Sequence, residues 1–154
     1  MTYERSELGE FSSVVCFKAV ITGVEDTLGK EGAGVVFTRA GKVRGHNLAR
    51  DLGIVNSQIP VDQLAEKLNA ALGQAGTRLA NVVSVREENG TITVDTTETV
   101  CSAGEDMGSD RECTFTLGAI WGALEAITGK TLLGEQTGSV LRGGQYDTFV
   151  FEGL

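Results

Sequence analysis

Apolar residues recur at three- and four-residue steps near the start of the chain, as they do on one face of an α-helix. Ser12 or Ser13 can cap such a helix, and Gly29 stands where a glycine often ends one. The pattern predicts a helix up to about residue 28, with an apolar stripe made of Val14, Phe17, Ile21, Val24 and Leu28.

Glycines interrupt the next helical region. Glu31–Asp51 predicts one or two short helices around Gly41 and Gly45, because glycine destabilises a helix interior. Pro60 then stands at a position typical of a first helical turn. It predicts a third helix over residues 61–75, whose apolar residues again share one face.

The pattern changes to a period of two in the middle of the chain. Leu79–Glu87 and Thr91–Thr99 flank Asn89-Gly90, a pair typical of a two-residue β-hairpin turn. In the first of these strands Val83 and Val85 alternate with polar residues. We therefore expect a hairpin with one apolar face and one face in contact with water.

Helical spacing returns after a polar loop, Ser102–Arg111. Cys113–Thr128 predicts a helix that Gly129 ends, and Gly118 and Gly122 lie four residues apart on it. Small residues at this spacing allow another backbone to approach closely. We expect the partner to be a helix or the sheet if this face is buried within the chain, and a second copy if the face is exposed.

The last segments, Leu132–Leu141 and Tyr146–Glu152, predict a second hairpin across residues 142–145. The resulting order is three helical segments, two strands, a helix and two strands. This order favours an α+β fold in which helices pack on a four-stranded antiparallel sheet. The 154 residues suit a single domain, with a polar tail over residues 1–10.

The net charge of −8 opposes general binding to nucleic acid or to anionic lipid. Residues 38–50 are nonetheless basic and include no acidic residue. A local basic patch on an acidic chain favours an anionic small molecule or partner, and a solvated helix face is the alternative. The residues concerned are Arg39, Lys42, Arg44, His46 and Arg50.

Cys16, Cys101 and Cys113 form an odd set without CxxC spacing. Met1–Glu10 lacks the apolar core of a signal peptide, so we expect a cytoplasmic protein with reduced thiols. A bridge or a shared metal at Cys101 and Cys113 is the alternative. No apolar run approaches the length of about 18 residues that a membrane span needs, so we expect no membrane insertion.

Sequence signatures of enzymes are largely missing. The chain contains no GxSxG motif, no Walker A motif and no GxGxxG motif after a predicted strand. His46, the single histidine, has no carboxylate or nucleophile at a recognisable spacing. A Cys–His pair that forms only in space is the alternative, but we expect no catalytic site.

The C-terminal half contains a series of short motifs, which Gly41–Gly45 (Gly-Lys-Val-Arg-Gly) precedes. Together they resemble the 4-vinyl reductase domain, also called the hydrocarbon-binding domain, over roughly residues 11–152. The resemblance implies the fold of the haem-nitric-oxide sensors and Golgi-transport subunits, and a homodimer that forms through helices. The motifs are Cys113-Thr-Phe-Thr-Leu-Gly118, Trp121-Gly122, Glu135 and Asp147-Thr-Phe149-Val-Phe151.

In the branch of this family that senses aromatic compounds, Cys, Glu, Cys and Cys hold a zinc ion. The first two ligands fall on Cys113 and Glu135, but the others fall near residues 138–139 and 146–148, where no cysteine stands. The resemblance therefore implies no structural zinc in this chain. We expect Ser139, Thr148 and Glu135 to replace it by hydrogen bonds across the last hairpin.

A pocket for a small ligand is expected between the helices and the sheet, with apolar walls and a few polar groups. Arg39, Arg44 and His46 beside it would suit carboxylates. For each aromatic residue, filling of the core is the alternative. The expected ligand-binding residues are Cys16, Phe17, Val20, Phe37, Arg39, Arg44, His46, Cys113, Phe115 and Trp121.

These observations lead us to expect a non-enzymatic domain that binds a hydrophobic ligand, or one both hydrophobic and anionic. A tetrapyrrole, an aromatic compound or a fatty acyl group would fit this description, and the cofactor is unknown. One alternative is an interaction or assembly factor for photosynthetic complexes. Another is a vinyl reductase, for which the chain has no nicotinamide or flavin fingerprint.

Overall fold

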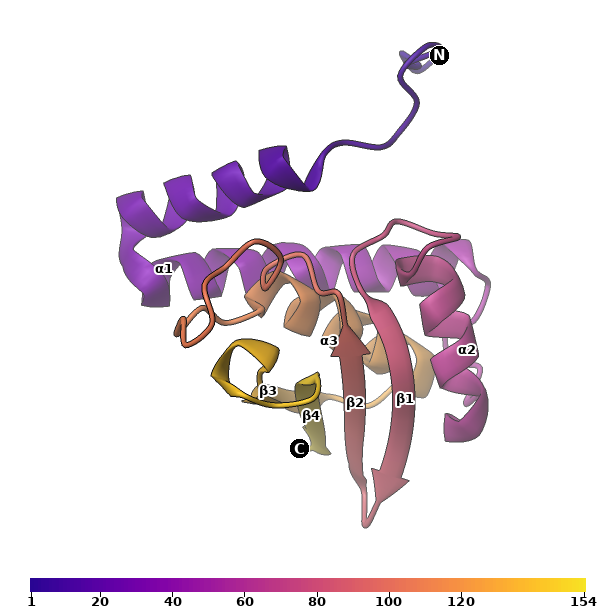
Figure 1. Ribbon diagram of the computed structural model, residues 1–154. Coiled ribbons are helices and arrows are strands. Elements are labelled where there is room, and N and C mark those ends of the chain that lie inside the picture. Colours follow the sequence, from indigo (N-terminus) through magenta and orange to yellow (C-terminus); the bar gives the residue numbers. More distant parts are fainter.

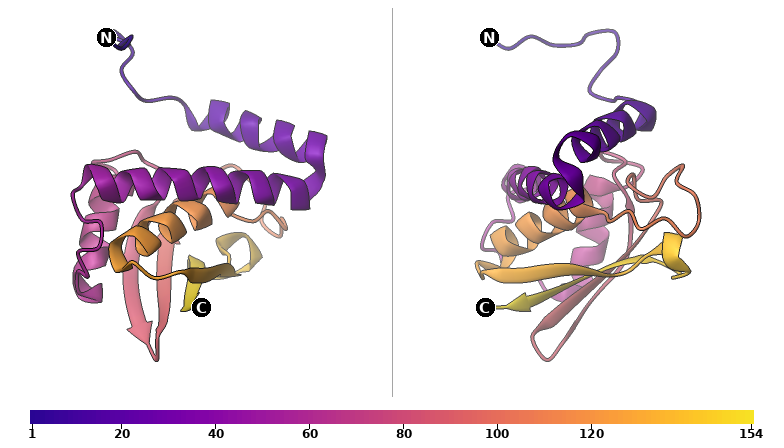
Figure 2. Two further views of the ribbon diagram at one scale, coloured as in Figure 1. Left: turned by 180° about the vertical axis from the view of Figure 1, so that it is seen from behind. Right: turned by 90° about the vertical axis from the view of Figure 1, so that its left-hand side faces the viewer.

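The central element of the computed structural model, which describes residues 1–154, is the apolar helix α3 (Thr114–Thr128). Figure 2 shows α3 between α1 (Val14–Asp51) on one side and the sheet on the other. Ten of its 15 residues are buried. A further helix, α2 (Val61–Leu72), packs against the first strand and ends three residues before the predicted end.

Four antiparallel strands form one sheet in the order β1-β2-β4-β3. The apolar face of the sheet lies against the helices, and Val94, Phe149 and Phe151 on it are completely buried. The predicted α+β architecture is therefore confirmed. The strands are β1 (Asn81–Glu88), β2 (Thr91–Thr97), β3 (Leu132–Gly138) and β4 (Asp147–Gly153).

The first hairpin has the predicted turn, because Asn89 and Gly90 both adopt the positive φ that a type I′ turn requires. Its first strand differs from the expected alternation. The register shifts between Val82 and Ser84, which places Val82 in the core and leaves Val83 46% exposed. A bulge of this kind moves every residue before it to the opposite face, so the expectation that Val83 faces the core is wrong.

The second hairpin is shorter than predicted. β3 ends at Gly138, and a 3₁₀ turn over Val140–Arg142 follows. The Ser139 hydroxyl accepts a hydrogen bond from the backbone N–H of Leu141 at 3.1 Å, and the Asp147 carboxylate accepts one from Val140 at 3.0 Å. These side chains satisfy the backbone groups of the turn, which therefore replaces the end of the predicted strand.

A sharp reversal at Gly29 divides α1 into two helical arms. Gly29 has φ 74° and ψ 170°, a conformation that favours glycine. The first arm (residues 14–28) folds back over the second arm (residues 30–51), and the N-terminal tail extends away from both (Figure 1). The second arm is one continuous helix through Gly41 and Gly45, so of the predicted one or two short helices the structure has a single longer one.

Glycines on both helices allow the second arm and α3 to lie backbone against backbone. A Cβ atom on Gly41 or Gly45 would lie within 3.0 Å of backbone atoms of α3, and one on Gly118 or Gly122 would meet the second arm equally closely. Real Cβ atoms essentially never approach so closely. The face of Gly118 and Gly122 is thus used within the chain, so it is not available for a second copy.

The outer face of the sheet has a buried charge. Asp95 is 4% exposed; it accepts hydrogen bonds from Ser84 at 3.0 Å and Thr148 at 2.8 Å, and pairs with Arg86. Burial alone would raise the pKa of Asp95, but these partners outweigh it and lower the pKa. This network joins β1, β2 and β4.

None of the helices is both long and apolar enough to cross a lipid bilayer.

The close contact at the glycines predicts that the same Gly→Ala substitution changes the free energy of unfolding at one position of α1 and not at another. Gly45→Ala should lower the free energy of unfolding by about 1–3 kcal/mol or more, because the new methyl group forces the two backbones apart. Gly23→Ala on the first arm, where no atom lies within 4 Å of the added Cβ, should leave it unchanged or raise it by up to about 1 kcal/mol. Urea unfolding followed by circular dichroism measures both. Equal effects would contradict the close contact.

Candidate functional site

Three aromatic side chains meet where the first arm, the second arm and the N-terminal turn of α3 converge. The rings of Phe17 and Phe115 lie edge to face with their centroids 5.3 Å apart. Phe37 on the second arm is 7% exposed beside them. Phe17, Phe37 and Phe115, three of the predicted ligand-binding residues, are thus brought together from segments far apart in the sequence.

The space that these rings enclose is small. Its volume is about 10 Å³, which is at the lower limit for one water molecule. No open pocket is found at these rings, and α3 occupies the space between the second arm and the sheet (Figure 2). The residues that line the small cavity are Phe17, Ile21, Phe37, Cys101, Glu112, Thr114, Phe115 and Thr116.

An open groove of about 1000 Å³ runs along the second arm beside this cavity. Phe37, Glu112 and Thr114 line both, so the groove leads directly to the aromatic cluster. Arg39 and His46, two further predicted residues, lie on the groove. Its other lining residues are Glu25, Lys30, Glu31, Ala33, Gly34, Val35, Thr38, Lys42, Val43, Asp110 and Arg111.

The lysine, arginine and carboxylate side chains that line the groove carry equal numbers of positive and negative charges. Four basic residues face four acidic ones, and several are paired: Lys42 binds Glu125 at 2.7 Å, and Lys30 pairs with Asp110. Burial alone would raise the pKa of Glu125, but Lys42 and the backbone N–H of Leu132 outweigh it and lower the pKa. The basic segment over residues 38–50 therefore does not form a uniformly positive site.

Ion pairs hold the first arm over the aromatic cluster. Glu105 in the loop before α3 pairs with Lys18 and, at 2.5 Å, with Arg111, whose guanidinium also reaches Glu25 at 3.0 Å. We call Lys18, Glu25, Glu105 and Arg111 the charge cluster. The only buried residue of the first arm is Ile21, so these pairs are a large part of its attachment.

Lys18 and Arg111 stabilise the charged form of the Glu105 carboxylate. The hydrogen bond from Lys18, with a further contribution from Arg111, lowers the pKa of Glu105 despite its partial burial. The Lys18 ammonium also donates to the backbone carbonyl of Cys101 at 2.8 Å. The first arm is thereby tied to both ends of the loop.

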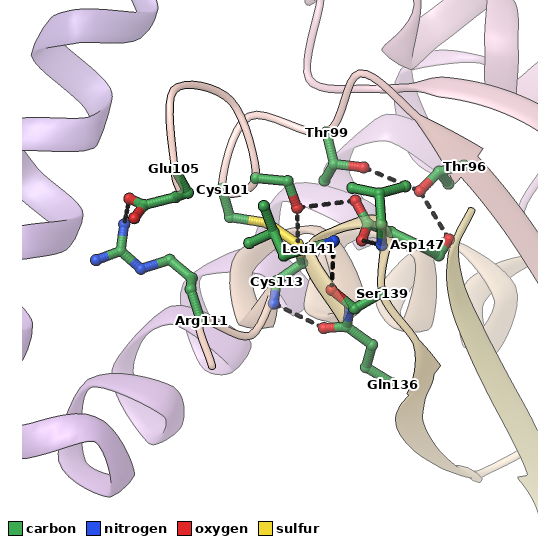
Figure 3. The surroundings of a disulfide bond; sticks show 12 residues. Thr96, Thr99, Cys101, Glu105, Arg111, Cys113, Gln136, Ser139, Leu141 and Asp147 are labelled. Carbon is green, nitrogen blue, oxygen red and sulfur yellow. Dashed lines mark hydrogen bonds and ion pairs between the residues drawn. A yellow bond between two sulfur atoms is a disulfide. The ribbon is translucent and has the colours of Figure 1, made fainter. Parts of the chain in front are cut away.

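A disulfide joins Cys101 to Cys113 and closes that loop (Figure 3). Their Cα atoms are 5.3 Å apart, and both side chains are buried. The expectation of three reduced thiols is therefore wrong for this pair. The structure instead has the disulfide bridge that the sequence analysis gave as the alternative. Cys16 is free and exposed.

Polar groups surround Cys113. Its backbone N–H donates to the Gln136 side chain at 2.8 Å, and its sulfur lies 3.4 Å from the Ser102 hydroxyl. Ser102 in turn donates to the carboxylate of the fully buried Asp147 at 2.9 Å (Figure 3). The disulfide thus lies beside a partly buried hydroxyl and a fully buried carboxylate.

The residues present do not fit the zinc site of the aromatic-sensing branch. Cys113 is committed to the disulfide, Glu135 is exposed, and no group of three or more His, Cys, Asp or Glu side chains is arranged to hold a metal ion. The expected hydrogen bonds across the last hairpin are also wrong. Thr148 donates to Asp95, Ser139 binds its own turn, and Gln136 makes the link from β3 to α3.

The remaining predicted site residues lie elsewhere. Cys16 and Val20 are exposed on the first arm, and Arg44 lies outside the lining of both the groove and the cavity. Trp121 packs against Phe151, with centroids 6.3 Å apart, and its indole donates to the carbonyl of Leu132 at 3.0 Å. These four residues do not join the aromatic cluster.

Sequence reasoning missed the charge cluster. Lys18 and Glu105 are 87 residues apart, and Glu25 and Arg111 are 86 apart, so no local pattern links them. The only signal was the placement of Lys18 and Glu25 beside the apolar stripe of a predicted helix.

Comparison with known proteins shows the fold. No family model matches the chain, and no curated protein matches it. Among solved structures, one similar chain is the phenol-responsive sensory domain of the transcription activator PoxR with phenol. The TM-score is 0.68 at 19% identity, over 94% of this chain and 76% of that one.

Another is a trafficking protein particle complex subunit 3 from Naegleria fowleri covalently bound to palmitic acid. Here the TM-score is 0.61 at 12% identity, over 92% of this chain and 95% of that one. Both likenesses cover nearly all of this chain. They show that its α+β fold is the one found in this sensory domain and this trafficking subunit.

The charge cluster predicts that acid loosens the first arm. Because the folded protein lowers the pKa of Glu105, the ion pairs contribute stability above the ordinary carboxyl pKa of about 4.3 and lose it as pH falls through the lowered value. At neutral pH, Glu105→Gln should therefore reduce amide hydrogen-exchange protection over residues 14–28 by about three- to tenfold. The difference from the unsubstituted chain should shrink in acid.

Glu66→Gln, on an exposed position of α2, is the matched control and should leave the first arm unchanged. Equal protection in the Glu105→Gln variant and the unsubstituted chain at neutral pH would show that apolar contacts alone hold the arm.

Proposed function

We propose that this domain binds a small, largely apolar ligand without converting it chemically. The ligand enters along the groove beside the second arm and reaches the aromatic cluster of Phe17, Phe37 and Phe115. The observation that carries the proposal is the shared border: Phe37, Glu112 and Thr114 line both the groove and the aromatic cavity.

The chemistry of the walls selects the class of ligand. Aromatic rings favour an aromatic or aliphatic group by contact area and edge-to-face packing. The groove supplies as many acidic as basic side chains, so it has no general preference for a multiply charged anion. An uncharged or weakly polar ligand fits these walls better than a tetrapyrrole with several carboxylates.

The two structural neighbours support a small hydrophobic ligand, since one is described with phenol and the other with palmitic acid. In this chain the aromatic cavity, at about 10 Å³, is too small for either compound. Binding therefore requires the first arm to move outward. Its attachment through Ile21, the partly buried Phe17 and Val24, and the charge cluster suits such a movement, because only one residue of the arm is fully buried.

A larger side chain in the groove should weaken ligand binding while the domain stays folded. Gly34 lies on the groove, and a Cβ there would meet only Thr114, at an ordinary 3.6 Å. Gly34→Leu should therefore leave the fold intact and weaken phenol binding at least tenfold, because leucine occupies the path to Phe37. Phenol titration monitored by ¹H–¹⁵N spectra measures this effect.

Gly23→Leu is the matched control, since it makes the same change on the first arm where space is open. Phenol-induced shifts should be found at residues 33–46 and 112–116 in the unsubstituted chain and in the control. Absence of saturable shifts with phenol, and with palmitate as a second probe, would overturn the proposal.

The homodimer stays a prediction. Val15, Val20 and Val36 are exposed apolar residues of α1 outside the groove, and they offer a surface for association. Sedimentation equilibrium distinguishes a dimer from a monomer of 16.2 kDa.

A further inference from the structure

Apolar packing contributes little to the conformation of the loop between Cys101 and Cys113. None of the residues from 102 to 112 is buried, and Gly104 and Gly108 have positive φ with open space around them. Backbone and side-chain contacts to residues 141 and 142 hold its far side. The disulfide is the only covalent cross-link between the two ends of the loop, and hydrogen bonds from Ser102 to Asp147 and from Cys113 to Gln136 hold each end separately.

This loop is also the part of the domain to which the first arm is tied. Glu105 and Arg111 lie within it, and the carbonyl of Cys101 accepts the Lys18 ammonium. Cys101 itself lines the aromatic cavity. A change at the disulfide therefore reaches the charge cluster and the cavity through direct contacts.

The surroundings of Cys113 are suited to a free thiol as well as to a disulfide. A buried S–H group needs an acceptor, and the Ser102 oxygen is 3.4 Å from the sulfur. Ser102 keeps its own proton directed at Asp147, so one hydroxyl can accept from the thiol and donate to the carboxylate at the same time. Gln136 holds the backbone of Cys113 in place in either state.

From these contacts we infer that the Cys101–Cys113 disulfide is a reversible redox switch that controls access to the ligand site. A dithiol reductant supplies two electrons and two protons. One of its thiolates attacks a sulfur of the pair and forms a mixed disulfide, and its second thiolate displaces the protein thiolate. The products are the two protein thiols and the cyclic disulfide of the reductant.

Reduction releases Cys101 from Cys113, weakens the charge cluster and lets the first arm carry Phe17 away from Phe37 and Phe115. The inference rests on the proposed function where it concerns ligand access. Because coupling between two equilibria is reciprocal, a ligand that binds the reduced form more tightly must also favour reduction. The contact of the second arm with α3 does not involve the loop and is expected to stay intact.

The experiment compares the oxidised and reduced forms of the full chain carrying Cys16→Ser, which removes the third thiol. Amide hydrogen exchange should be about fivefold or more faster in the reduced form, over residues 14–28 and 101–113 only. Phenol, the probe, should bind the reduced form about fivefold or more tightly. Cys101→Ser should reproduce both effects without a reductant.

Thiol counting by alkylation and mass spectrometry in dithiothreitol redox buffers measures the equilibrium between the two forms. Phenol should shift it toward the dithiol by the same factor as the affinities differ. Ser102→Ala should shift it toward the disulfide by about two- to tenfold, because the reduced Cys113 loses its acceptor. Ser12→Ala, in the exposed tail, is the control and should shift nothing.

The outcomes separate the switch from the proposed function. Global loss of protection on reduction, or identical exchange in both forms, would overturn the switch and identify the disulfide as a purely structural bond. Equal phenol affinity in both forms would also overturn it and leave the proposed function standing. Faster exchange of the first arm without any phenol binding would support release of the arm and reject the proposed function.

Discussion

The direct contact between the backbones of α1 and α3 fixes the position of everything else in this domain. Four glycines remove the side chains that would otherwise keep two helices about 8–10 Å apart. α3 is then enclosed between the second arm and the sheet, which explains why an almost wholly apolar helix of 15 residues is stable there. The glycines lower intrinsic helix propensity, and burial of α3 offsets that cost.

The same contact decides where open space remains beside the two helices. Two helices in backbone contact leave no volume between them, so free space lies at the edge of their interface, along the outer side of the second arm. Phe37 stands at this edge because it is one turn before Gly41 on the same helix. It therefore separates the open groove from the rings of Phe17 and Phe115. Under the proposed function, ligand access therefore depends on the first arm and not on the sheet.

Local patterns were sufficient for the elements whose causes are local. Pro60, Asn89-Gly90 and the stripe of α3 predicted a helix, a hairpin and a second helix at nearly the observed positions. The sequence left one or two helices open over the second arm because propensity counts Gly41 and Gly45 against a helix, whereas the structure uses both glycines as contacts. The bulge that exposes Val83, the charge cluster and the path past Phe37 all depend on residues distant in sequence. No periodicity contains that information.

The two arms of α1 differ in the forces that hold them. The second arm is attached mainly by close packing against α3, which is insensitive to salt or to pH near neutrality, and the Lys42–Glu125 ion pair adds to it. The first arm has one buried residue and two partly buried apolar ones, Phe17 and Val24, and its other attachments are ion pairs, whose strength varies with ionic strength and protonation. Elements with few buried apolar contacts open locally at far lower free energy than the whole domain unfolds. Gly29 separates the two arms mechanically, because the first helical arm ends there before the second begins. Opening can therefore be confined to the first arm, and a site beneath it can exchange its contents while the core remains folded.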